Sequence, residues 1–456
     1  MNEQKKIPPG YSFLASLVRT YKQAKNPIGT MQESMEKFKG TYSVNLGTIR
    51  MIGTQDPGLI EYVLQKNHRN YYKSALQTEH LGRFLGKGLL TANGDYWLKQ
   101  RRLIQPGFHM EKIHALYAIM KNTVDEFLKT FPTGKEVDVY PLMHRLAFDI
   151  VINTLFNVDV PAEKRQQLSN FISEVQVFVM RDVRNPHKRW WFKFSGELQE
   201  NLTKAEGARE IIRFLIRQRQ QSNKKFNDLL DMLLDARYED TGEAMKEEQV
   251  IDEILIVLIA GHETTANALS WSLYLLAKHP EELKKVREAS VTLGVNESVT
   301  HEELNNVIKE SMRLYPPAWI SDRVALQDDA YENFLIPKGT IIALFYYGLH
   351  RDEKQWKDAT TFKPSRFSKE SLRQAQADIS AKEIKKIYYP FGAGPRLCIG
   401  NNFAMAEMAI FLQSFIKQFE IAPTGIEPVI RPLVTLRPDR VVLTVSRLTT
   451  KSSRPL

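Results

Sequence analysis

The chain has 456 residues, of which 43% are hydrophobic and 25% are charged, a balance typical of an ordinary globular protein. This composition excludes wholesale disorder, a collagen-like repeat and a multi-span membrane protein. The single cysteine excludes an intramolecular disulfide and any CxxC zinc or redox site.

The chain is basic, with 63 Lys and Arg residues against 53 Asp and Glu and a pI of about 9.3. Such a charge suits acidic partners or an anionic membrane surface, but no helix-turn-helix, zinc-finger or RNP pattern accompanies it, so we expect no nucleic-acid binding. The opening stretch MNEQKKIPPGYSF contains neither a long apolar run nor a signal-peptide core. We therefore expect a cytoplasmic protein without a membrane anchor.

No repeat or flexible linker divides the sequence, so residues 1–456 are interpreted as one large domain. Alternating apolar residues around Gly47 predict a hairpin in a β-rich region at about 40–60. Apolar residues at the helical period predict helices over Met110–Phe131, Tyr140–Phe156, Glu197–Gln221 and Val299–Leu314. Further strands are predicted at Gly339–Tyr346, Val434–Leu436 and Val441–Val445. The predicted fold class is mainly α with a small β part.

One helix is predicted to be unusually long, running from about Glu248 to the His279-Pro280 pair, where proline prevents continuation. At 1.5 Å per residue it would extend ~45 Å, enough to cross a domain. Its middle, residues 261–265, is GHETT, and a glycine with four polar residues costs helix stability. Such a local weakness usually indicates a functional site.

The lone cysteine, Cys398, lies in FGAGPRLCIG, directly before an apolar helical segment that begins at Asn401 or Asn402. An asparagine N-cap would place Cys398 near a helix N-terminus, which favours a thiolate. Two interpretations remain open from the loop alone: a buried structural cysteine, or a thiolate ligand to a metal or cofactor. A dinucleotide-binding fingerprint is excluded because Leu397 occupies its third glycine position.

The stretch FGAGPRLCIG resembles the haem-binding loop FxxGxRxCxG of the cytochrome P450 monooxygenases. Four further segments resemble motifs of this family in the same order: Trp97 with Arg101 (WxxxR), Ala260–Thr265 (the oxygen-activation motif), Glu310–Arg313 (ExxR) and Phe362–Phe367 (a PERF-type motif). The resemblance covers essentially the whole chain, from IPPG near the start to the C-terminal strands. It implies a single P450-type domain of the soluble bacterial type, with the long central helix crossing over the haem.

The resemblance assigns Cys398 as the axial ligand of the haem iron, where a thiolate donates electron density that favours O–O cleavage. Because CxxCH is absent, the haem would be non-covalent haem b. Residues implied to hold it are Phe391 on the thiolate side, Trp97, Arg101, Arg323 and Arg396 at the propionates, and Ala260 and Gly261 above the ring. The alternative for each arginine is an ordinary solvated cation.

On the oxygen side, Gly261 is expected to leave room for dioxygen, Thr264 to donate a hydrogen bond or hold a water, and Glu263 to relay protons. In the competing interpretation Thr264 bonds back to a helix carbonyl and Glu263 faces solvent. A zinc-protease HExxH is excluded, since Ala266 stands where the second histidine should be.

Glu310 and Arg313 are three residues apart and can pair on one helix face, and by resemblance Arg366 joins them. This network is expected to hold the thiolate loop in place, so that its loss would prevent haem incorporation.

The expected substrate is a lipophilic small molecule, because the segments that resemble the family's pocket are mostly apolar: Leu89, Leu90, Ile259, Ala318, Ile320, Val434 and Thr435. The basic and aromatic stretch 181–192 resembles the family's mobile lid. A membrane contact or lipid entrance is one interpretation of it, and a solvated loop with tucked aromatic residues is the favoured one.

The resemblance implies a monooxygenase that uses O₂ and two electrons. Because no dinucleotide fingerprint is present, we expect the electrons from a separate ferredoxin or flavodoxin with its reductase. A basic docking patch is predicted from Lys99, Arg102, Lys382, Lys385 and Lys386. The alternatives are a peroxide-driven haem-thiolate hydroxylase, whose Arg-Pro pair disagrees with Glu263-Thr264, and a non-catalytic haem-based sensor.

Overall fold

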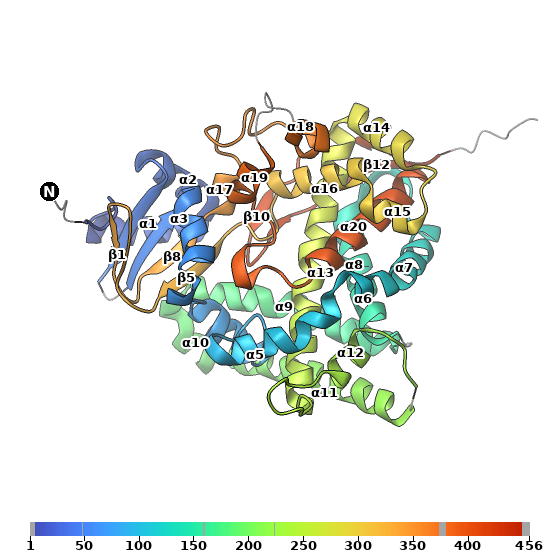
Figure 1. Ribbon diagram of the computed structural model, residues 1–456, viewed down its shortest axis with the longest axis horizontal. Coiled ribbons are helices and arrows are strands. Elements are labelled where there is room, and N and C mark those ends of the chain that lie inside the picture. The colour runs from blue at the N-terminus through green and yellow to red at the C-terminus, as the bar shows by residue number, and fades with distance from the viewer. Residues whose placement is uncertain (1–4, 48, 158–159, 223, 374–379, 449–456) are drawn as a thin grey trace, which may run out of the picture.

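Helices form most of the structure, a computed structural model that describes residues 5–47, 49–157, 160–222, 224–373 and 380–448 (Figure 1). The α-helices are α1 Phe13–Lys25, α2 Pro27–Lys37, α3 Pro57–Glu61, α4 Gly82–Leu85, α5 Gly94–Ile104, α6 Met110–Ala115, α7 Tyr117–Lys129, α8 Val139–Phe156, α9 Ala162–Arg184, α10 Arg189–Phe194, α11 Glu197–Ser222, α12 Leu229–Asp235, α13 Glu247–Lys278, α14 Pro280–Ser290, α15 Val295–Thr300, α16 Glu302–Leu314, α17 Tyr346–Leu349, α18 Lys369–Arg373, α19 Ala381–Ile387 and α20 Asn401–Ile416. The mainly helical prediction is confirmed. None of the described helices has the length and hydropathy needed to cross a bilayer.

Within the described residues, the strands form four small sheets. They are β1 Thr41–Leu46, β2 Ile49–Thr54, β3 Tyr71–Tyr72, β4 Gly134–Asp138, β5 Ser321–Ala325, β6 Asp329–Tyr331, β7 Phe334–Ile336, β8 Ile341–Leu344, β9 Phe419–Pro423, β10 Ile430–Pro432, β11 Leu436–Pro438 and β12 Val442–Arg447. The largest sheet has the order β1-β2-β8-β5-β3, with β2 and β8 parallel and the other neighbours antiparallel. The predicted hairpin is present as β1 and β2, in which Leu46 pairs with Ile49.

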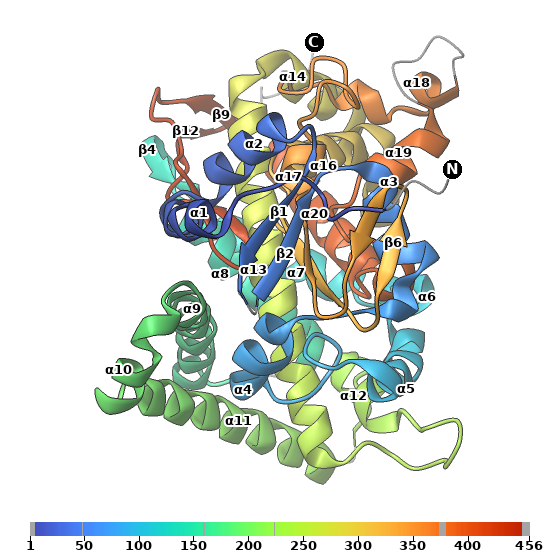
Figure 2. The same ribbon diagram turned by 90° about the vertical axis from the view of Figure 1, so that its left-hand side faces the viewer.

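Helix α13 runs through the middle of the molecule, beside α8 and α20 (Figures 1 and 2). Its 32 residues extend ~48 Å and end before Pro280, as predicted. The helix is unbroken at Gly261. A β-carbon at this position would lie 3.3 Å from Cγ2 of Val151 on α8. The missing side chain therefore allows close packing of the two helices, which offsets the ~1 kcal/mol cost of a mid-helix glycine.

Several predicted boundaries are wrong. Met110–Phe131 is divided into α6 and α7 at Leu116, and Val299–Leu314 is divided into α15 and α16. The second break has a clear cause, because His301 is extended and the side chain of Asn305 donates to the carbonyls of both Val299 and His301. Tyr346 begins a helix rather than ending a strand, and residues 434–435 precede β11.

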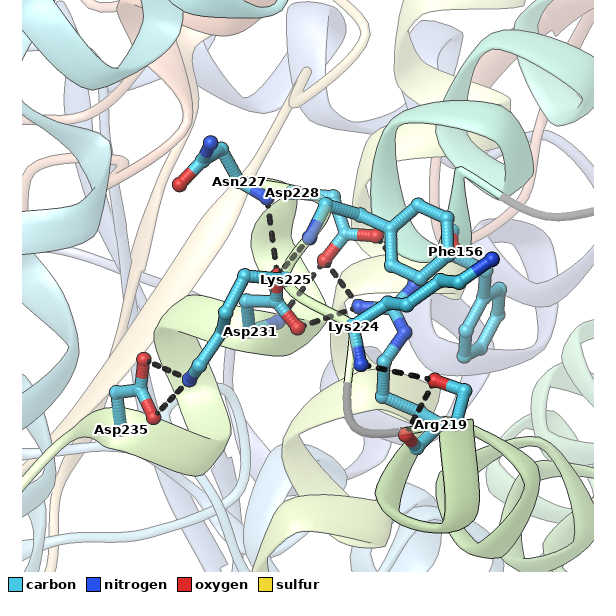
Figure 3. A network of polar contacts seen from close by, with 10 residues as sticks. Phe156, Arg219, Lys224, Lys225, Asn227, Asp228, Asp231 and Asp235 are labelled. Atoms are coloured by element: carbon cyan, nitrogen blue, oxygen red, sulfur yellow. Dashed lines mark hydrogen bonds and ion pairs between the residues drawn. The ribbon is translucent and has the colours of Figure 1, made fainter.

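A buried ion network fixes the end of α11 against α12 and α8 (Figure 3). Arg219 donates to Asp228 at 2.8 and 2.6 Å, to Asp231 at 2.6 Å and to the carbonyl of Phe156. Its guanidinium also lies over the ring of Phe226, with 4.3 Å to the ring centroid. The network anchors one end of the pair formed by α9 and α11.

Two histidines lie between α8 and α13. Nε2 of His262 donates to the carbonyl of His144 at 3.0 Å, and the rings meet edge to face with centroids 4.9 Å apart. Burial lowers the pKa of His144 to about 3 and that of His262 to about 4. Both side chains are therefore neutral in the folded protein at neutral pH.

We expect the free energy of unfolding to fall as the pH drops from about 6.5 towards 4. In this range His144 and His262 become protonated in the unfolded chain but stay neutral in the folded protein. His262→Gln retains a donor for the His144 carbonyl. It also removes one of the two histidines that take up a proton only in the unfolded chain. The slope of stability against pH should decrease by about 1.4 kcal/mol per pH unit in this window. Urea unfolding across the pH range measures it, with the exposed His187→Gln as the control. An unchanged slope in His262→Gln would contradict this account.

Candidate active site

The loop that carries Cys398 connects α19 to α20 and is closed by a hydrogen bond of 2.9 Å from the Cys398 N–H to the carbonyl of Phe391. Gly394 has a φ of 68°, and a β-carbon there would lie 2.1 Å from the carbonyl oxygen of Leu64. The loop therefore packs directly against the backbone of the turn Tyr62–Lys66. Helix α20 begins at Asn401, but its N-cap is Gly400 and not the asparagine expected from the sequence.

The thiol of Cys398 is accessible, which excludes the interpretation as a buried structural cysteine. Protein atoms nevertheless surround much of the sulfur, and this burial raises the pKa of Cys398, while the Gly400 N–H and the charge of Arg101 act in the opposite direction. The residue is a thiol at neutral pH until a cation favours the thiolate. Within the described residues, no three His, Cys, Asp or Glu side chains gather as a metal site. Any metal ion bound at Cys398 would therefore need its other ligands from a cofactor or from solvent.

Four cationic side chains gather beside this loop: Lys73, Arg101, Arg323 and Arg396. Burial and the charges of Arg396 and Arg323 lower the pKa of Lys73 to about 6. Burial, followed by the charge of Arg323, also lowers the pKa of Arg396 to about 10. In the described part of the chain none of the four forms an ion pair with a carboxylate, although Glu253 acts on Lys73 from a distance.

The three arginines are not solvated cations. Arg101, on α5, donates to the carbonyl of Leu397 at 2.9 Å, one residue before the cysteine. Arg323, on β5, is 9% exposed and donates to the carbonyl of Asp322 at 2.6 Å. Arg396 lies over the ring of Trp97, with 4.3 Å to the centroid. Backbone carbonyls and an aromatic ring hold the guanidinium groups but leave their charges uncompensated.

The sequence analysis did not identify Lys73, because this residue belongs to no recognisable motif. It follows Tyr72, which pairs with Val324 across β3 and β5, so Lys73 lies level with Arg323. Its ammonium donates to the carbonyls of Leu89 and Ala92. The place of Lys73 beside Arg323 depends on the pairing of β3 with β5, which lie far apart in the sequence. No local sequence pattern indicates that pairing.

These residues fit an iron porphyrin. Charges on buried or half-buried arginines that no carboxylate compensates are unfavourable. A group with two carboxylates would neutralise them, and guanidinium groups match carboxylates in geometry. The indole N–H of Trp97, free of partners among the described residues, adds another donor to the same cluster. A metal ion at Cys398 would stabilise the thiolate that burial disfavours.

The middle of α13 presents three side chains of the predicted oxygen-activation motif. Ala260 is exposed although its neighbour Ile259 is buried, so this face of the helix borders accessible space. Oγ1 of Thr264 donates to the carbonyl of Ala260 at 2.7 Å, as in the competing interpretation from the sequence. A β-carbon built on Gly261 would point towards α8. That Gly261 leaves room for dioxygen therefore stays a prediction.

Glu263 does not face solvent, since only 3% of it is exposed. Burial raises its pKa, whereas hydrogen bonding with Thr435 and Gln176 and the charge of Arg437 act in the opposite direction. One carboxylate oxygen, Oε2, has no partner in the described part of the chain. Its raised pKa favours the protonated carboxyl, and Oε2 is left without a partner, so Glu263 is a candidate proton donor.

The ExxR network is present and fully buried. Arg313 donates to both oxygens of Glu310, at 2.8 and 2.9 Å, and Arg366 donates to Glu310 at 3.3 Å. Arg313 also donates to the carbonyls of His350 and Ala359, each at 2.6 Å.

His350, which the sequence analysis missed, links this network to the cysteine loop. Its carbonyl accepts from Arg313, and its Nε2 accepts from the N–H of Tyr389 at 2.9 Å. The carbonyl of Tyr389 in turn accepts from Gly392 at 3.1 Å. A continuous series of hydrogen bonds therefore extends from α16 to the loop of Cys398.

The predicted substrate residues do not form one group. Leu89, Leu90 and Ile259 belong to the largest apolar cluster, and Ile320 packs against a different one. Ala318 and Val434 are half-buried outside both clusters. Thr435 is buried and accepts from Asn267 of α13 at 3.0 Å, so its hydroxyl is already engaged. A pocket formed by these residues stays a prediction.

The predicted docking patch is divided. Lys99 pairs with Asp240 at 2.7 Å, and both views separate α5, which carries Lys99 and Arg102, from α19 (Figures 1 and 2). Lys382, Lys385 and Lys386 on α19 are exposed and lie close together in sequence. The α19 lysines are the more suitable part of the patch.

Arg313→Ala should lower the free energy of unfolding by about 3–5 kcal/mol, because it leaves the buried carboxylate of Glu310 without its partner. The exposed Glu126–Lys129 pair, at 2.5 Å and also three residues apart, provides the matched control. Lys129→Ala should cost less than about 0.5 kcal/mol. Urea unfolding measures both variants, and equal losses would contradict the assigned role of the network.

Comparison with known proteins identifies the family of the chain. A family model for cytochrome P450 matches residues 6–445. A cyclooctat-9-en-7-ol 5-monooxygenase of Streptomyces melanosporofaciens is 28% identical over 397 residues, which cover 83% of this chain and 82% of that protein. An echinocystic acid 23-monooxygenase of Saponaria officinalis is 29% identical over 436 residues, covering 86% and 79%.

The crystal structure of a mutant cytochrome P450DA haem domain has the same fold, with a TM-score of 0.83, 22% identity and 98% of both chains covered. Plant and mammalian proteins are among the similar sequences, so the expected soluble bacterial type stays a prediction. The family match over nearly the whole chain, together with the cysteine loop, shows what the protein is. The chain belongs to the cytochrome P450 family of haem-thiolate monooxygenases.

Proposed function

We propose that the protein binds haem b through Cys398 and inserts one oxygen atom of O₂ into a lipophilic small molecule. The observation that carries this proposal is the cluster of Lys73, Arg101, Arg323 and Arg396 beside the only cysteine. The absence of CxxCH from the sequence supports the non-covalent b-type haem.

Haem bound through a thiolate supplies the redox chemistry that activates O₂. Toward it, Phe391 and Trp97 would pack beside the ring, and the four cations would orient it by its carboxylates. Ala260, on the accessible face of α13, would border the space above the ring. Cys398 and the basic side chains would hold the group from the side of the cysteine loop, and α13 would lie on the opposite side.

Glu263 and Thr264 are proposed to deliver protons. Burial raises the pKa of Glu263 and so favours its protonated form, and Oε2 has no partner among the described residues, so this carboxyl is proposed as the proton donor. Thr264 uses its hydroxyl hydrogen on the carbonyl of Ala260, so its oxygen is left to accept a hydrogen bond from a water. Thr264 would therefore position a water, and Glu263 would donate a proton to this water as the water releases one of its own protons towards the reaction site.

The lipophilic substrate is supported by the apolar residues Leu89, Leu90 and Ile259, which share one cluster. The relatives named for oxidation of cyclooctat-9-en-7-ol and echinocystic acid agree with such a substrate. Two electrons would come from a ferredoxin or flavodoxin with its reductase, docked at the exposed lysines of α19. A location in the cytoplasm stays a prediction.

Carbon monoxide difference spectroscopy of the reduced protein tests the ligand. The wild-type protein should give the red-shifted band of a thiolate-bound haem, and Cys398→His should bind haem but lose that band, because imidazole donates less electron density. Identical spectra would contradict the assignment of Cys398. Product formation with O₂ and a surrogate reductase would exclude the sensor, and equal turnover with peroxide alone would favour the peroxide-driven hydroxylase.

Titration of the cofactor-free chain with hemin tests the cation cluster. Lys73→Met should weaken hemin binding about tenfold or more, since a charge-assisted hydrogen bond to a carboxylate is lost, and should raise the free energy of unfolding of the cofactor-free chain at neutral pH, because Lys73 gives up its proton on folding. Hemin dimethyl ester, which has no carboxylates, should bind equally to both proteins. The exposed Lys87→Met is the matched control. Equal affinities of Lys73→Met and wild type for hemin would overturn the role of Lys73.

A further inference from the structure

Residues 86–93 connect α4 to α5 beside α13 and form a turn that closes on itself (Figure 2). The N–H groups of Thr91 and Ala92 donate to the carbonyl of Gly88 at 3.0 and 2.8 Å. The hydroxyl of Thr91 accepts from the Gly88 N–H at 3.0 Å and donates to the carbonyl of Gly86 at 2.8 Å. The 86–93 turn therefore keeps its shape by its own hydrogen bonds, and contacts from outside set its position relative to α13.

Glu253 of α13 makes one of these outside contacts. Both of its carboxyl oxygens accept from the N–H of Leu89, each at 3.1 Å, and the residue is only 1% exposed. A β-carbon at Gly88 would lie 2.7 Å from Cδ of Glu253 and 2.7 Å from Cδ1 of Ile256. The missing side chain at Gly88 thus allows the backbone of the turn to lie directly on α13.

Lys73 holds the other backbone polar group of the same residue. Its side-chain nitrogen donates to the carbonyl of Leu89, and also to that of Ala92 at 3.3 Å. Leu89 is therefore held at its N–H by Glu253 and at its carbonyl by Lys73, an arrangement that we call the Leu89 clamp. Because Lys73 also belongs to the cation cluster, the clamp connects that cluster to α13.

The 86–93 turn has apolar side chains at its tip and open space beside it. Leu89 and Leu90 are half-buried and pack against the apolar cluster that contains Ile259. A hollow of about 620 Å³ borders the turn and is lined by Thr78, Gly82, Gly86, Lys87, Thr91, Ala92, Asn93 and Asp252. A segment beside such a space is held in place by specific contacts more than by close packing.

The stretch that resembles the family's lid, 181–192, offers no comparable wall. It forms the end of α9, a short helical turn at Pro186–Lys188 and most of α10, in which Trp190 and Trp191 are 66 and 48% exposed. The favoured expectation from the sequence, a solvated loop with tucked aromatic residues, is therefore wrong for these two tryptophans.

The carboxyl of Glu253 is mostly neutral below pH 7. Burial raises the pKa of Glu253 to about 7, and the charge of Asp252 acts in the same direction, whereas the Leu89 N–H and the charge of Lys73 oppose the rise. A glutamine has nearly the same shape, an acceptor oxygen and no charge. Glutamine at this position would thus preserve the clamp, and leucine, which has no acceptor, would remove it.

We propose that Glu253 is a positioning residue for the substrate pocket: by accepting from the Leu89 N–H it fixes how far Leu89 and Leu90 lie from α13, and thereby sets the size of the lipophilic molecule that the protein accepts. The inference rests on the proposed function, which places these two leucines in the pocket wall. Glu253 acts only through the turn, and Lys73 gives the cation cluster a contact with the same wall.

Hydrogen exchange of the cofactor-free chain, followed by mass spectrometry at pH 6, tests the clamp without haem. Glu253→Leu should make exchange in residues 86–93 at least about tenfold faster, because the Leu89 N–H loses its acceptor. Glu253→Gln should restore protection to within about twofold of the wild type. Gly88→Ala provides a second variant, since its β-carbon would push the turn away from an unaltered Glu253, and it should also speed exchange.

The matched control removes another buried carboxyl. Glu407 on α20 is fully buried, and neither of its oxygens has a hydrogen-bond partner among the described residues. Glu407→Leu should leave exchange in 86–93 as in the wild type. Wild-type exchange in both Glu253→Leu and Gly88→Ala, or equally fast exchange in Glu407→Leu or in Glu253→Gln, would overturn the clamp.

Absorbance titration of the haem-loaded protein tests the effect on ligand size. Imidazole and the bulky imidazole derivative clotrimazole bind haem iron through the same kind of nitrogen, so the ratio of their dissociation constants measures the room in the pocket. Glu253→Leu should change this ratio at least about tenfold, and Glu253→Gln should change it by less than about twofold. Faster exchange in Glu253→Leu with an unchanged ratio would overturn the role in size selection. A wild-type chain that takes up no hemin would instead contradict the proposed function, and the exchange experiment would still decide the clamp.

Discussion

Repulsion among like charges is the constraint on which this site depends. Arg101, Arg323 and Arg396 come from three separate segments, and the repulsion between their charges opposes the convergence of those segments. The same charges, together with burial, lower the pKa of the adjacent Lys73 to about 6. Backbone carbonyls hold the side chains in place without neutralising them. The fold is thus complementary in charge to a dianion, and the accessible sulfur nearby is complementary to a metal. One porphyrin satisfies both requirements, which relates the fold directly to the family's chemistry.

A second, distinct part of the molecule keeps the sulfur in position. Glu310 and Arg313 compensate each other completely, so this buried pair stabilises the surrounding backbone instead of awaiting a ligand. His350 carries the same hydrogen-bond series to Tyr389 and onward to the cysteine loop. Its neutral ring is required for that role, because an unprotonated Nε2 must accept the hydrogen bond from the N–H of Tyr389. The charges of Glu310 and Arg313 are paired and stabilise the fold. The charges of the basic residues beside the cysteine loop are unpaired and are available to a bound group.

Features that depend on local periodicity could be predicted from the sequence. Helix α13, the β1–β2 hairpin and the shared faces of Trp97 with Arg101 and Glu310 with Arg313 all follow from spacings of a few residues. Long-range features could not be predicted. The position of Lys73 beside Arg323 depends on the pairing of β3 with β5. The role of His350 depends on the hydrogen bond that its carbonyl accepts from Arg313, which is distant in sequence. The close packing at Gly261 depends on the approach of α8. No local pattern encodes these contacts.

The close approach of Gly394 to the carbonyl of Leu64 has a consequence for protein engineering. A side chain at this position would collide with backbone that has no room to retreat, whereas a β-carbon at Gly392 or Gly400 would meet no atom within 4 Å. Libraries that aim to tune the donor strength of the sulfur should therefore leave residue 394 unchanged. Diversity belongs at Ala393, Pro395 and Leu397, whose side chains are at least partly accessible and can alter the electrostatic surroundings of the sulfur.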